Sequence, residues 1–121
     1  MAQPVVVSAP DYSVIVPAYQ AADVIGACVR ALARQTIERA RYEIIVVDDG
    51  STDATADVAR EAGADRVVRI PHGGPSTARN AGIEAAQGEI VLFTDADCEP
   101  AEDWIAQMVA PLADPQVMGV K

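Results

Sequence analysis

Residues 43–53 read Glu-Ile-Ile-Val-Val-Asp-Asp-Gly-Ser-Thr-Asp, an apolar run that ends abruptly in acidic and hydroxyl side chains. Consecutive branched apolar residues are typical of a strand that is buried on both faces, which in practice indicates a parallel sheet. The Gly-Ser-Thr-Asp that follows is typical of a turn leading into a helix, because such side chains cap helix starts. The stretch therefore predicts a strand, a turn and a helix, the repeating unit of α/β proteins.

The rest of the chain repeats this alternation. Short runs rich in Val and Ile predict strands at residues 12–18, 42–47, 66–70, 89–94 and 116–120. Between them lie segments whose apolar residues recur every three or four positions, as on one face of a helix. Helices are predicted at 53–62 and 76–87, with a first helix marked by Val24, Ile25, Cys28 and Leu32 and a last one by Ile105, Met108 and Leu112. Five strands alternating with four helices predict a doubly wound, mostly parallel α/β sheet.

The start of the third helix has a recognisable sequence, Gly-Gly-Pro-Ser at residues 73–76. Either Pro75, with its preset φ, or the capping hydroxyl of Ser76 can open a helix. Gly88 is predicted to end it, because glycine readily adopts the conformation that terminates helices.

The chain has 121 residues, 50% of them hydrophobic and 22% charged, as is typical of one globular domain. We expect residues 1–10 to form a flexible amino-terminal segment and residues 11–121 to form the domain. The apolar run at residues 116–121 has no polar tail, which indicates a domain truncated at its carboxyl end. Such an exposed last strand favours pairing with a second copy, so a homo-oligomer is expected.

Nine basic and eighteen acidic side chains give a formal charge of −9, which disfavours nucleic acids and anionic membranes as partners. Cys28 and Cys98 are far apart and only one histidine is present, so neither a zinc site nor a disulfide framework is encoded. We find no positively charged leader and no apolar run long enough to span a bilayer. A reducing, cytoplasmic location is expected, or the cytosolic face of a membrane in a longer parent protein.

Acidic side chains follow two of the predicted strands. Asp49 comes after the second strand, and Asp95 and Asp97 come after the fourth. Ligands of open parallel sheets bind beyond the carboxyl ends of the strands, so these carboxylates are predicted to share one edge. Alternation along an extended backbone would point Asp95 and Asp97 the same way. The acids of residues 48–53 have an equally good structural interpretation as the start of a helix.

Carboxylates that face one another repel unless a cation joins them. Their oxygens are hard ligands that suit Mg²⁺ or Mn²⁺, ions that commonly lie between acidic side chains and the phosphates of a substrate. A chain of charge −9 would otherwise repel a diphosphate. The N–H groups at the helix start after Gly73 and Gly74 are further candidates for phosphate binding, as is Arg79, which fits equally well as a solvated helix residue.

We predict structural roles, and not roles in a functional site, for the other reactive or aromatic residues. His72, between a proline and a glycine, is predicted to be an exposed loop residue and not a catalyst. Cys98 is expected to be a poor nucleophile, because the acidic residues on both sides disfavour its thiolate. Cys28, Trp104 and Met108 are predicted to belong to the core.

Four motifs follow one another along the chain. They are Ser-Val-Ile-Val-Pro-Ala-Tyr at 13–19, the stretch 43–53, Gly-Pro-Ser-Thr-Ala-Arg-Asn-Ala-Gly at 74–82 and Asp-Ala-Asp at 95–97. Each is weak alone, but together, at this spacing, they resemble family 2 glycosyltransferases of the GT-A fold. The resemblance implies a Rossmann-like donor-binding half of an enzyme that takes a sugar from a nucleotide-diphosphate donor, most often a UDP-sugar. It also implies inversion at the anomeric centre.

The resemblance implies roles for the residues around the nucleoside. Pro17 and Tyr19 would border the nucleoside, and Asp49 would accept a hydrogen bond from the base, commonly uracil. Arg79 would lie near the nucleotide.

Asp95-Ala96-Asp97 matches the DxD motif of the family. By resemblance, Asp97 binds the Mg²⁺ or Mn²⁺ ion directly, and Asp95 contacts the ribose, the metal or both. The general base, usually Asp or Glu, lies in the family beyond the point that matches Lys121. No catalytic base is therefore assigned, the acceptor is not predicted, and the chain by itself is expected to be inactive.

Other classes share parts of this pattern. A phosphoacceptor signalling domain needs a lysine at a later strand end, and the only lysine is Lys121. A haloacid-dehalogenase-like phosphotransferase carries its Asp-x-Asp early, with a small residue after it and not Cys98. An oxidoreductase needs Gly-x-Gly-x-x-Gly after the first strand, where residues 17–20 read Pro-Ala-Tyr-Gln. A non-catalytic nucleotide-binding module remains an alternative.

Overall fold

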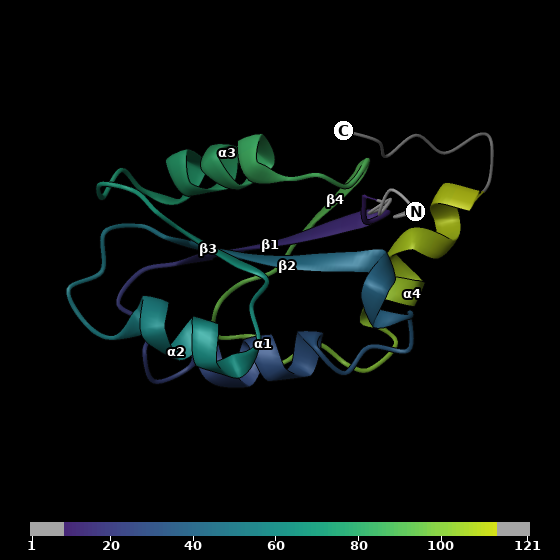
Figure 1. Cartoon of the computed structure of the whole chain (residues 1–121), viewed down its shortest axis with the longest axis horizontal. Helices are drawn as coiled ribbons and strands as arrows, with labels where there is room; N and C mark the ends of the chain where they lie inside the picture. Colours follow the sequence, from purple (N-terminus) through teal and green to yellow (C-terminus); the bar gives the residue numbers. More distant parts are fainter. Residues whose placement is uncertain (1–8, 114–121) are drawn as a thin grey trace, which may run out of the picture.

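The computed structural model describes residues 9–113, in which strands and helices alternate (Figure 1). The elements are β1 (Tyr12–Ala18), α1 (Ile25–Leu32), the 3-10 helix η1 (Arg39–Arg41), β2 (Tyr42–Asp48), α2 (Thr55–Ala62), β3 (Arg66–Arg69), α3 (Pro75–Ala85), β4 (Ile90–Phe93), α4 (Trp104–Val109) and the 3-10 helix η2 (Ala110–Ala113). The predicted strand at 116–120 lies outside the described residues.

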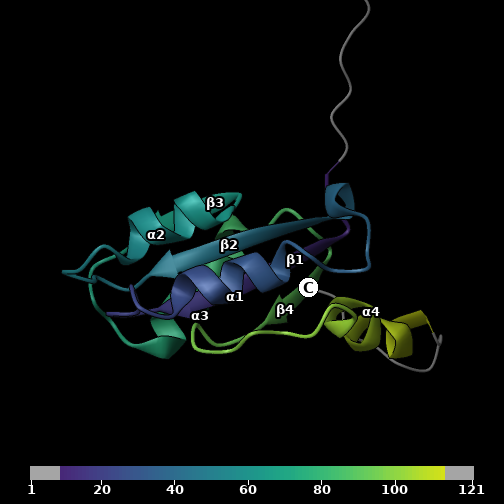
Figure 2. The same ribbon diagram turned by 90° about the horizontal axis from the view of Figure 1, so that it is seen from below.

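The four strands form one parallel sheet in the order β3-β2-β1-β4. In this register Val14 of β1 lies between Ile44 of β2 and Leu92 of β4. Helix α3 covers one face of the sheet, whereas α1 and α2 cover the other (Figures 1 and 2). The predicted doubly wound, Rossmann-like α/β fold is thereby confirmed.

The two central strands divide their side chains between two cores, because successive residues of a strand point to opposite faces. Val14 and Val16 pack in the cluster that contains α1, whereas Ile15 and Ile45 pack with Ala78 of α3. As predicted from the apolar runs, β1 and β2 are buried along nearly their whole length. The same prediction is wrong for β3 and β4, which are only partly buried because each lies at an edge.

Helix α2 begins two residues later than predicted. Asp53 lies in the preceding turn, where its Oδ1 accepts the N–H of Thr55 at 3.1 Å and its Oδ2 accepts the N–H of Ala22 at 3.1 Å. The acidic turn therefore joins the start of α2 to the loop before α1.

Helix α3 spans residues 75–85 and not 76–87. Pro75 is its first residue and no side chain caps its start, so the preset φ of proline opens it. Gly88 does not end the helix, since the backbone is already extended at Ala86. Glycine is required at position 88 for another reason: a Cβ there would lie 2.7 Å from the carbonyl carbon of Tyr12.

Two residues of the predicted apolar stripes are not in the core. Val24 precedes α1 and is 39% exposed, and Met108 in α4 is 45% exposed. Helix α4 has only six residues and buries only Ile105 fully, because it lies at the margin of the sheet (Figure 2). Trp104 is partly buried against the core, as predicted.

Cys28 is buried in the core, as predicted, and burial raises the pKa of its thiol to about 12. Its Sγ lies 3.5 Å from the carbonyl oxygen of Asp95. Cys98 is exposed, and neither cysteine forms a disulfide. Within residues 9–113, no helix combines the length and the apolar character needed to cross a bilayer.

A buried carboxylate organises the amino end of the sheet. Glu43 at the start of β2 accepts hydrogen bonds from the Ser13 hydroxyl at 2.6 Å and from the N–H of Gln87 at 2.7 Å. Arg66 of β3 forms an ion pair with it at 2.9 Å. One side chain thus connects β1, β2, β3 and the segment that follows α3.

Candidate functional site

The direction in which strands are added to the sheet reverses next to β1, which creates a switch point at the carboxyl edge of the sheet. The chain adds β2 and β3 on one side of β1 and then crosses to add β4 on the other side. Open α/β sheets bind ligands at such a switch point, where loops separate from one another. A cavity of about 410 Å³ opens here. Its lining includes all six residues predicted to bind nucleotide or metal, namely Pro17, Tyr19, Asp49, Arg79, Asp95 and Asp97.

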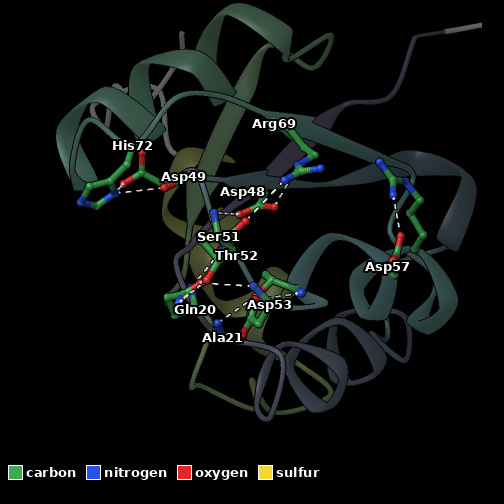
Figure 3. Close-up of polar contacts among 12 residues, drawn as sticks. Gln20, Ala21, Asp48, Asp49, Ser51, Thr52, Asp53, Asp57, Arg69 and His72 are labelled. Atoms are coloured by element: carbon green, nitrogen blue, oxygen red, sulfur yellow. Dashed lines mark hydrogen bonds and ion pairs between the residues drawn. The ribbon is translucent and has the colours of Figure 1, made fainter.

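The first acid after β2 has a structural role. Asp48 is 1% exposed, and its Oδ1 accepts the N–H of Ser51 at 3.0 Å. Its Oδ2 lies 3.3 Å from Nε of Arg69, an ion pair without the alignment of a hydrogen bond. Asp48 therefore supports the turn and does not line the cavity (Figure 3).

The second acid, Asp49, lines the cavity and also fixes its wall. Its carboxylate accepts the N–H groups of Gly73 at 2.8 Å and Gly74 at 3.0 Å. We expected N–H groups at this helix start to be available for a phosphate. Those of Gly73 and Gly74 are already bound to Asp49, and Pro75 has no N–H to offer. The prediction now rests on the N–H groups of Ser76 and Thr77 in the first turn of α3 and stays a prediction. Asp49 therefore ties the start of α3 to the end of β2.

His72 is a cavity residue that the sequence analysis missed. Its Nδ1 lies 3.0 Å from both the carbonyl oxygen and the Oδ2 of Asp49 (Figure 3). Its ring stacks on Tyr19 with 4.1 Å between centroids and 26° between planes. As predicted, it is an exposed loop residue, with 54% of its side chain accessible. One signal could have placed it in the site: it follows β3 at the same sheet edge as the acids.

Gln20 is the second lining residue that was missed. It adopts a positive φ of 50°, which is uncommon for a residue with a side chain. Hydrogen bonds to the loop after β2 hold it there: its N–H donates to Ser51 Oγ at 2.8 Å, and its Oε1 accepts the Thr52 N–H at 2.6 Å (Figure 3). Because these contacts span thirty-odd positions, no local pattern indicates them.

The acids after β4 lie in a turn and not on extended backbone. The N–H of Cys98 donates to the carbonyl of Asp95 at 3.0 Å, so the alternation argument used for this segment was wrong. Proximity results nevertheless, since single ligand atoms of Asp95, Asp97 and Cys98 lie within 4.8 Å of one another. All three side chains are exposed. Two exposed carboxylates at this separation provide hard oxygen ligands that fit Mg²⁺ or Mn²⁺.

Arg79 supplies positive charge to a cavity whose lining includes the acids Asp49, Asp95 and Asp97. It is exposed on the first turns of α3 and lines the cavity. Within residues 9–113 it takes part in no ion pair, unlike the arginines at positions 39, 41, 60, 66 and 69. Its guanidinium is therefore available to an anionic ligand.

Fold and cavity together define an α/β protein with a ligand site at the carboxyl edge of a parallel sheet. The chain belongs to glycosyl transferase family 2, whose family model matches residues 13–120. It is 36% identical over 109 residues to the glycosyltransferase AglE of Haloferax volcanii, a match that covers 86% of this chain and 36% of that protein. Family membership favours the glycosyltransferase interpretation over the phosphoacceptor, phosphotransferase and oxidoreductase alternatives.

Solved structures agree with this assignment. Mannosyltransferase PcManGT from Pyrobaculum calidifontis, in complex with GDP-Man and Mn²⁺, has a TM-score of 0.78 and 35% identity, covering 91% of this chain and 34% of that chain. TarS 1–349 of Staphylococcus aureus, in complex with UDP-GlcNAc, has a TM-score of 0.77 and 32% identity, covering 84% and 31%. Our chain thus spans about a third of the length of these relatives. The GT-A fold expected from the resemblance is confirmed.

Proposed function

We propose that this chain binds a nucleotide-diphosphate sugar, most often a UDP-sugar, through a divalent cation, as the donor-binding part of an inverting glycosyltransferase. One observation carries the proposal: the elements around the switch point bring Tyr19, Asp49, Arg79 and the acids at 95 and 97 to one cavity. This combination offers an aromatic ring, hydrogen-bond acceptors, a guanidinium and metal ligands, the groups that a nucleoside diphosphate requires.

The nucleoside and the diphosphate of the donor each have a partner among these residues. The nucleoside lies against Pro17 and Tyr19, and its base reaches Asp49. Arg79 lies near the diphosphate, where a guanidinium can form paired hydrogen bonds with phosphate oxygens. The binding of UDP-GlcNAc by TarS and of GDP-Man by PcManGT supports this class of donor.

Asp97 and Asp95 are proposed to hold Mg²⁺ or Mn²⁺. When bound, such an ion neutralises the charge that develops on the diphosphate leaving group. The Mn²⁺ in the PcManGT complex supports a divalent ion. Charge supports it as well, because a chain of formal charge −9 repels an anionic ligand unless a cation lies between them.

Sugar transfer requires a second partner, an acceptor hydroxyl that attacks the anomeric carbon from the face opposite the diphosphate. Inversion follows from this in-line geometry, and a general base within hydrogen-bond reach would take the proton of the hydroxyl. We assign no described residue to that role. The proposed contribution of this chain is donor binding.

The first prediction tests the metal site. We expect UDP to bind the chain in the presence of MnCl₂ and to bind much more weakly in its absence. Asp97→Ala should reduce the Mn²⁺-dependent affinity for UDP by about 10-fold or more. The attraction between the Asp97 carboxylate and the cation that bridges it to the diphosphate contributes more than about 1.4 kcal/mol to binding. Isothermal titration calorimetry measures both effects.

Asp57→Ala is the matched control, because this exposed aspartate on α2 lies outside the cavity. Its affinity for UDP should equal that of the wild type. Binding of UDP that is independent of Mn²⁺, or unaffected by Asp97→Ala, would contradict the proposed site.

A further inference from the structure

We propose that Gln35 is a positioning residue for the metal site: from outside the cavity, its side chain holds the loop that carries Asp95 and Asp97 against the end of α1. This inference rests on the proposed function, because it takes these two acids as ligands of a divalent ion. Gln35 does not line the cavity, and the sequence analysis gave it no role.

The two acids lie on the connection between β4 and α4, residues 94–102, which we call the metal loop. It is the longest connection between elements within residues 9–113, and it runs alongside α1 on its way to α4 (Figure 2). An ion that bound two carboxylates on a loop free to move would have to order that loop at a cost in conformational entropy. The affinity for the ion therefore depends on the contacts that hold the metal loop.

Helix α1 holds the start of the metal loop. The Sγ atom of Cys28, a buried residue of α1, lies 3.5 Å from the main-chain oxygen of Asp95. The same oxygen accepts the N–H of Cys98 at 3.0 Å, which closes the turn around the two acids. Ala96, between the acids, packs against the core cluster that contains α1.

Gln35, just beyond α1, holds the far end of the metal loop. Its Nε2 donates to the main-chain oxygen of Ala101 at 2.8 Å and to that of Ala31 at 3.2 Å. Its Oε1 accepts the N–H of Ile105 at 2.9 Å. One amide side chain thus connects α1, the metal loop and the first turn of α4.

The Gln35 side chain is fixed by these bonds. Both of its N–H groups are used, so the amide cannot turn without losing a partner. Ile105 is fully buried and lies at the start of α4, where Asp103 provides no side-chain cap, so Gln35 satisfies an N–H that the helix itself leaves free. Beside it, the N–H of Thr36 donates to the main-chain oxygen of Glu102 at 2.7 Å.

Loss of the Gln35 bonds would release the far end of the metal loop and leave the rest of the cavity in place. Tyr19 and Asp49, proposed to contact the nucleoside, lie on the loops after β1 and β2. A change at Gln35 should therefore weaken the binding of the metal ion and leave the binding of a nucleoside unchanged. A general loss of folding would weaken both.

Gln35→Met tests this role, because methionine is similar in length and lacks the amide. We expect the affinity for Mn²⁺ in the presence of UDP, measured by water-proton relaxation, to fall about three- to tenfold, the value of about one hydrogen bond. The affinity for uridine, which has no phosphate, should equal that of the wild type when it is measured by NMR titration without metal. An equal loss of affinity for Mn²⁺ and for uridine would overturn the proposal.

Gln107→Met is the matched control. Gln107 is exposed on α4, and its side chain donates to Asp103 at the start of the same helix and not to α1. The substitution removes a glutamine hydrogen bond from the same region without releasing the metal loop from α1. Its affinity for Mn²⁺ should equal that of the wild type.

Gln35→Glu identifies which hydrogen bond matters. A carboxylate can still accept the N–H of Ile105, so the start of α4 keeps its partner, but it cannot donate to Ala101. Its added negative charge by itself favours a cation. A fall in the affinity for Mn²⁺ in this variant would therefore support the lost donor as the cause, and an unchanged affinity in both Gln35 variants would overturn the proposal.

Hydrogen exchange reports on the metal loop directly. Amides of residues 94–102 should exchange faster in Gln35→Met than in the wild type or Gln107→Met, whereas those of β1 and β2 should not change. Faster exchange in β1 and β2 as well would show a general loss of stability and overturn the positioning role. Wild-type protein that binds UDP with Mn²⁺, together with an unaffected Gln35→Met variant, would refute the role of Gln35 alone. Absence of Mn²⁺-dependent UDP binding by the wild type would refute the proposed function and this inference together.

Discussion

Gly82 shows how a single hydrogen atom in place of a side chain sets the distance between α3 and the sheet. A Cβ at this position would overlap the Ile15 side chain of β1. In an exposed helix, Gly→Ala would stabilise by about 0.5–1 kcal/mol. Overpacking a core costs about 1–3 kcal/mol, so the steric cost at Gly82 exceeds the stabilisation that alanine gives a helix. We therefore predict that Gly82→Ala destabilises the protein by about 1–2 kcal/mol, measured by urea unfolding.

Asn80→Ala is the control for this change, since Asn80 is exposed on the same helix. It should leave stability unchanged or raise it slightly, because alanine has the higher helix propensity. A Gly82→Ala protein as stable as the Asn80→Ala protein would show that α3 can shift away from Ile15 at no cost.

At the residue scale, the sequence predicted correctly which acids line the cavity, but it did not predict their local backbone conformation. Asp49, Asp95 and Asp97 were placed at one edge because each follows a strand, a rule that depends only on sheet topology. The turn at residues 95–98 was not foreseen, since a residue pair two positions apart fits both a strand and a turn. His72 was assigned to a solvated loop because its partners, Asp49 and Tyr19, are distant in sequence.

At the scale of elements, Glu43 joins three strands, and its ionisation should control their association. Burial works to raise the pKa of Glu43, but hydrogen bonds from Ser13, Gln87 and Arg66 together outweigh burial and hold the pKa below its usual value. Because the pKa of Glu43 is lower in the folded state, the ionised carboxylate stabilises the fold at pH values above the ordinary glutamate pKa. This stabilisation is lost as the pH falls through the folded value.

We predict that Glu43→Gln lowers the free energy of unfolding at pH 7 by about 1–3 kcal/mol, because an amide cannot replace the ion pair with Arg66. The difference from the wild type should begin to narrow as the pH falls below the ordinary glutamate pKa of about 4.3, and should narrow further towards the lower folded-state pKa, where the native carboxylate is protonated. Urea unfolding across this pH range measures it. Glu61→Gln, at an exposed position on α2, should behave like the wild type at every pH. If the difference in the free energy of unfolding between Glu43→Gln and the wild type did not depend on pH, the proposed role of the Glu43 charge would be contradicted.

The existence and type of the elements were predictable, whereas their ends were not. The four strands and the four α-helices within residues 9–113 follow from apolar runs and three-to-four periodicity, whereas the 3-10 helix η1 was not predicted. The end of α3 at Ala85 was missed because Gly88 gives the usual signal for a helix end. That glycine instead permits close approach to the Tyr12 backbone, a tertiary reason that no local pattern contains.

For the whole molecule, an excess of acidic side chains should make metal binding sensitive to salt. The formal charge of −9 attracts cations, and Asp95 and Asp97 are exposed to solvent ions. Screening lengths fall from about 10 Å at 0.1 M salt to about 3 Å at 1 M. We predict that the affinity for Mn²⁺, measured by calorimetry, falls several-fold over this range of NaCl. An affinity that does not depend on salt would indicate that the ion binds in a more enclosed site.

The strand order β3-β2-β1-β4 was not predicted, although the doubly wound class was. Apolar length did not reveal it, because the predicted strands at 42–47 and 89–94 are equally long, whereas in the structure the central strands β1 and β2 have seven residues each and the edge strands β3 and β4 have four. The order depends on which strands pair in the assembled sheet, and no single stretch of sequence contains that information. The boundaries of the domain and the pairing of copies stay predictions.

The hydrogen bonds from Gly73 and Gly74 to Asp49 are made entirely by atoms of this chain. The protein's own contacts therefore fix the loop that leads into α3, and little conformational entropy remains to be lost there on binding. On that side the wall of the cavity is preformed. Affinity should consequently depend on how well a donor matches this wall, more than on how far the wall can move.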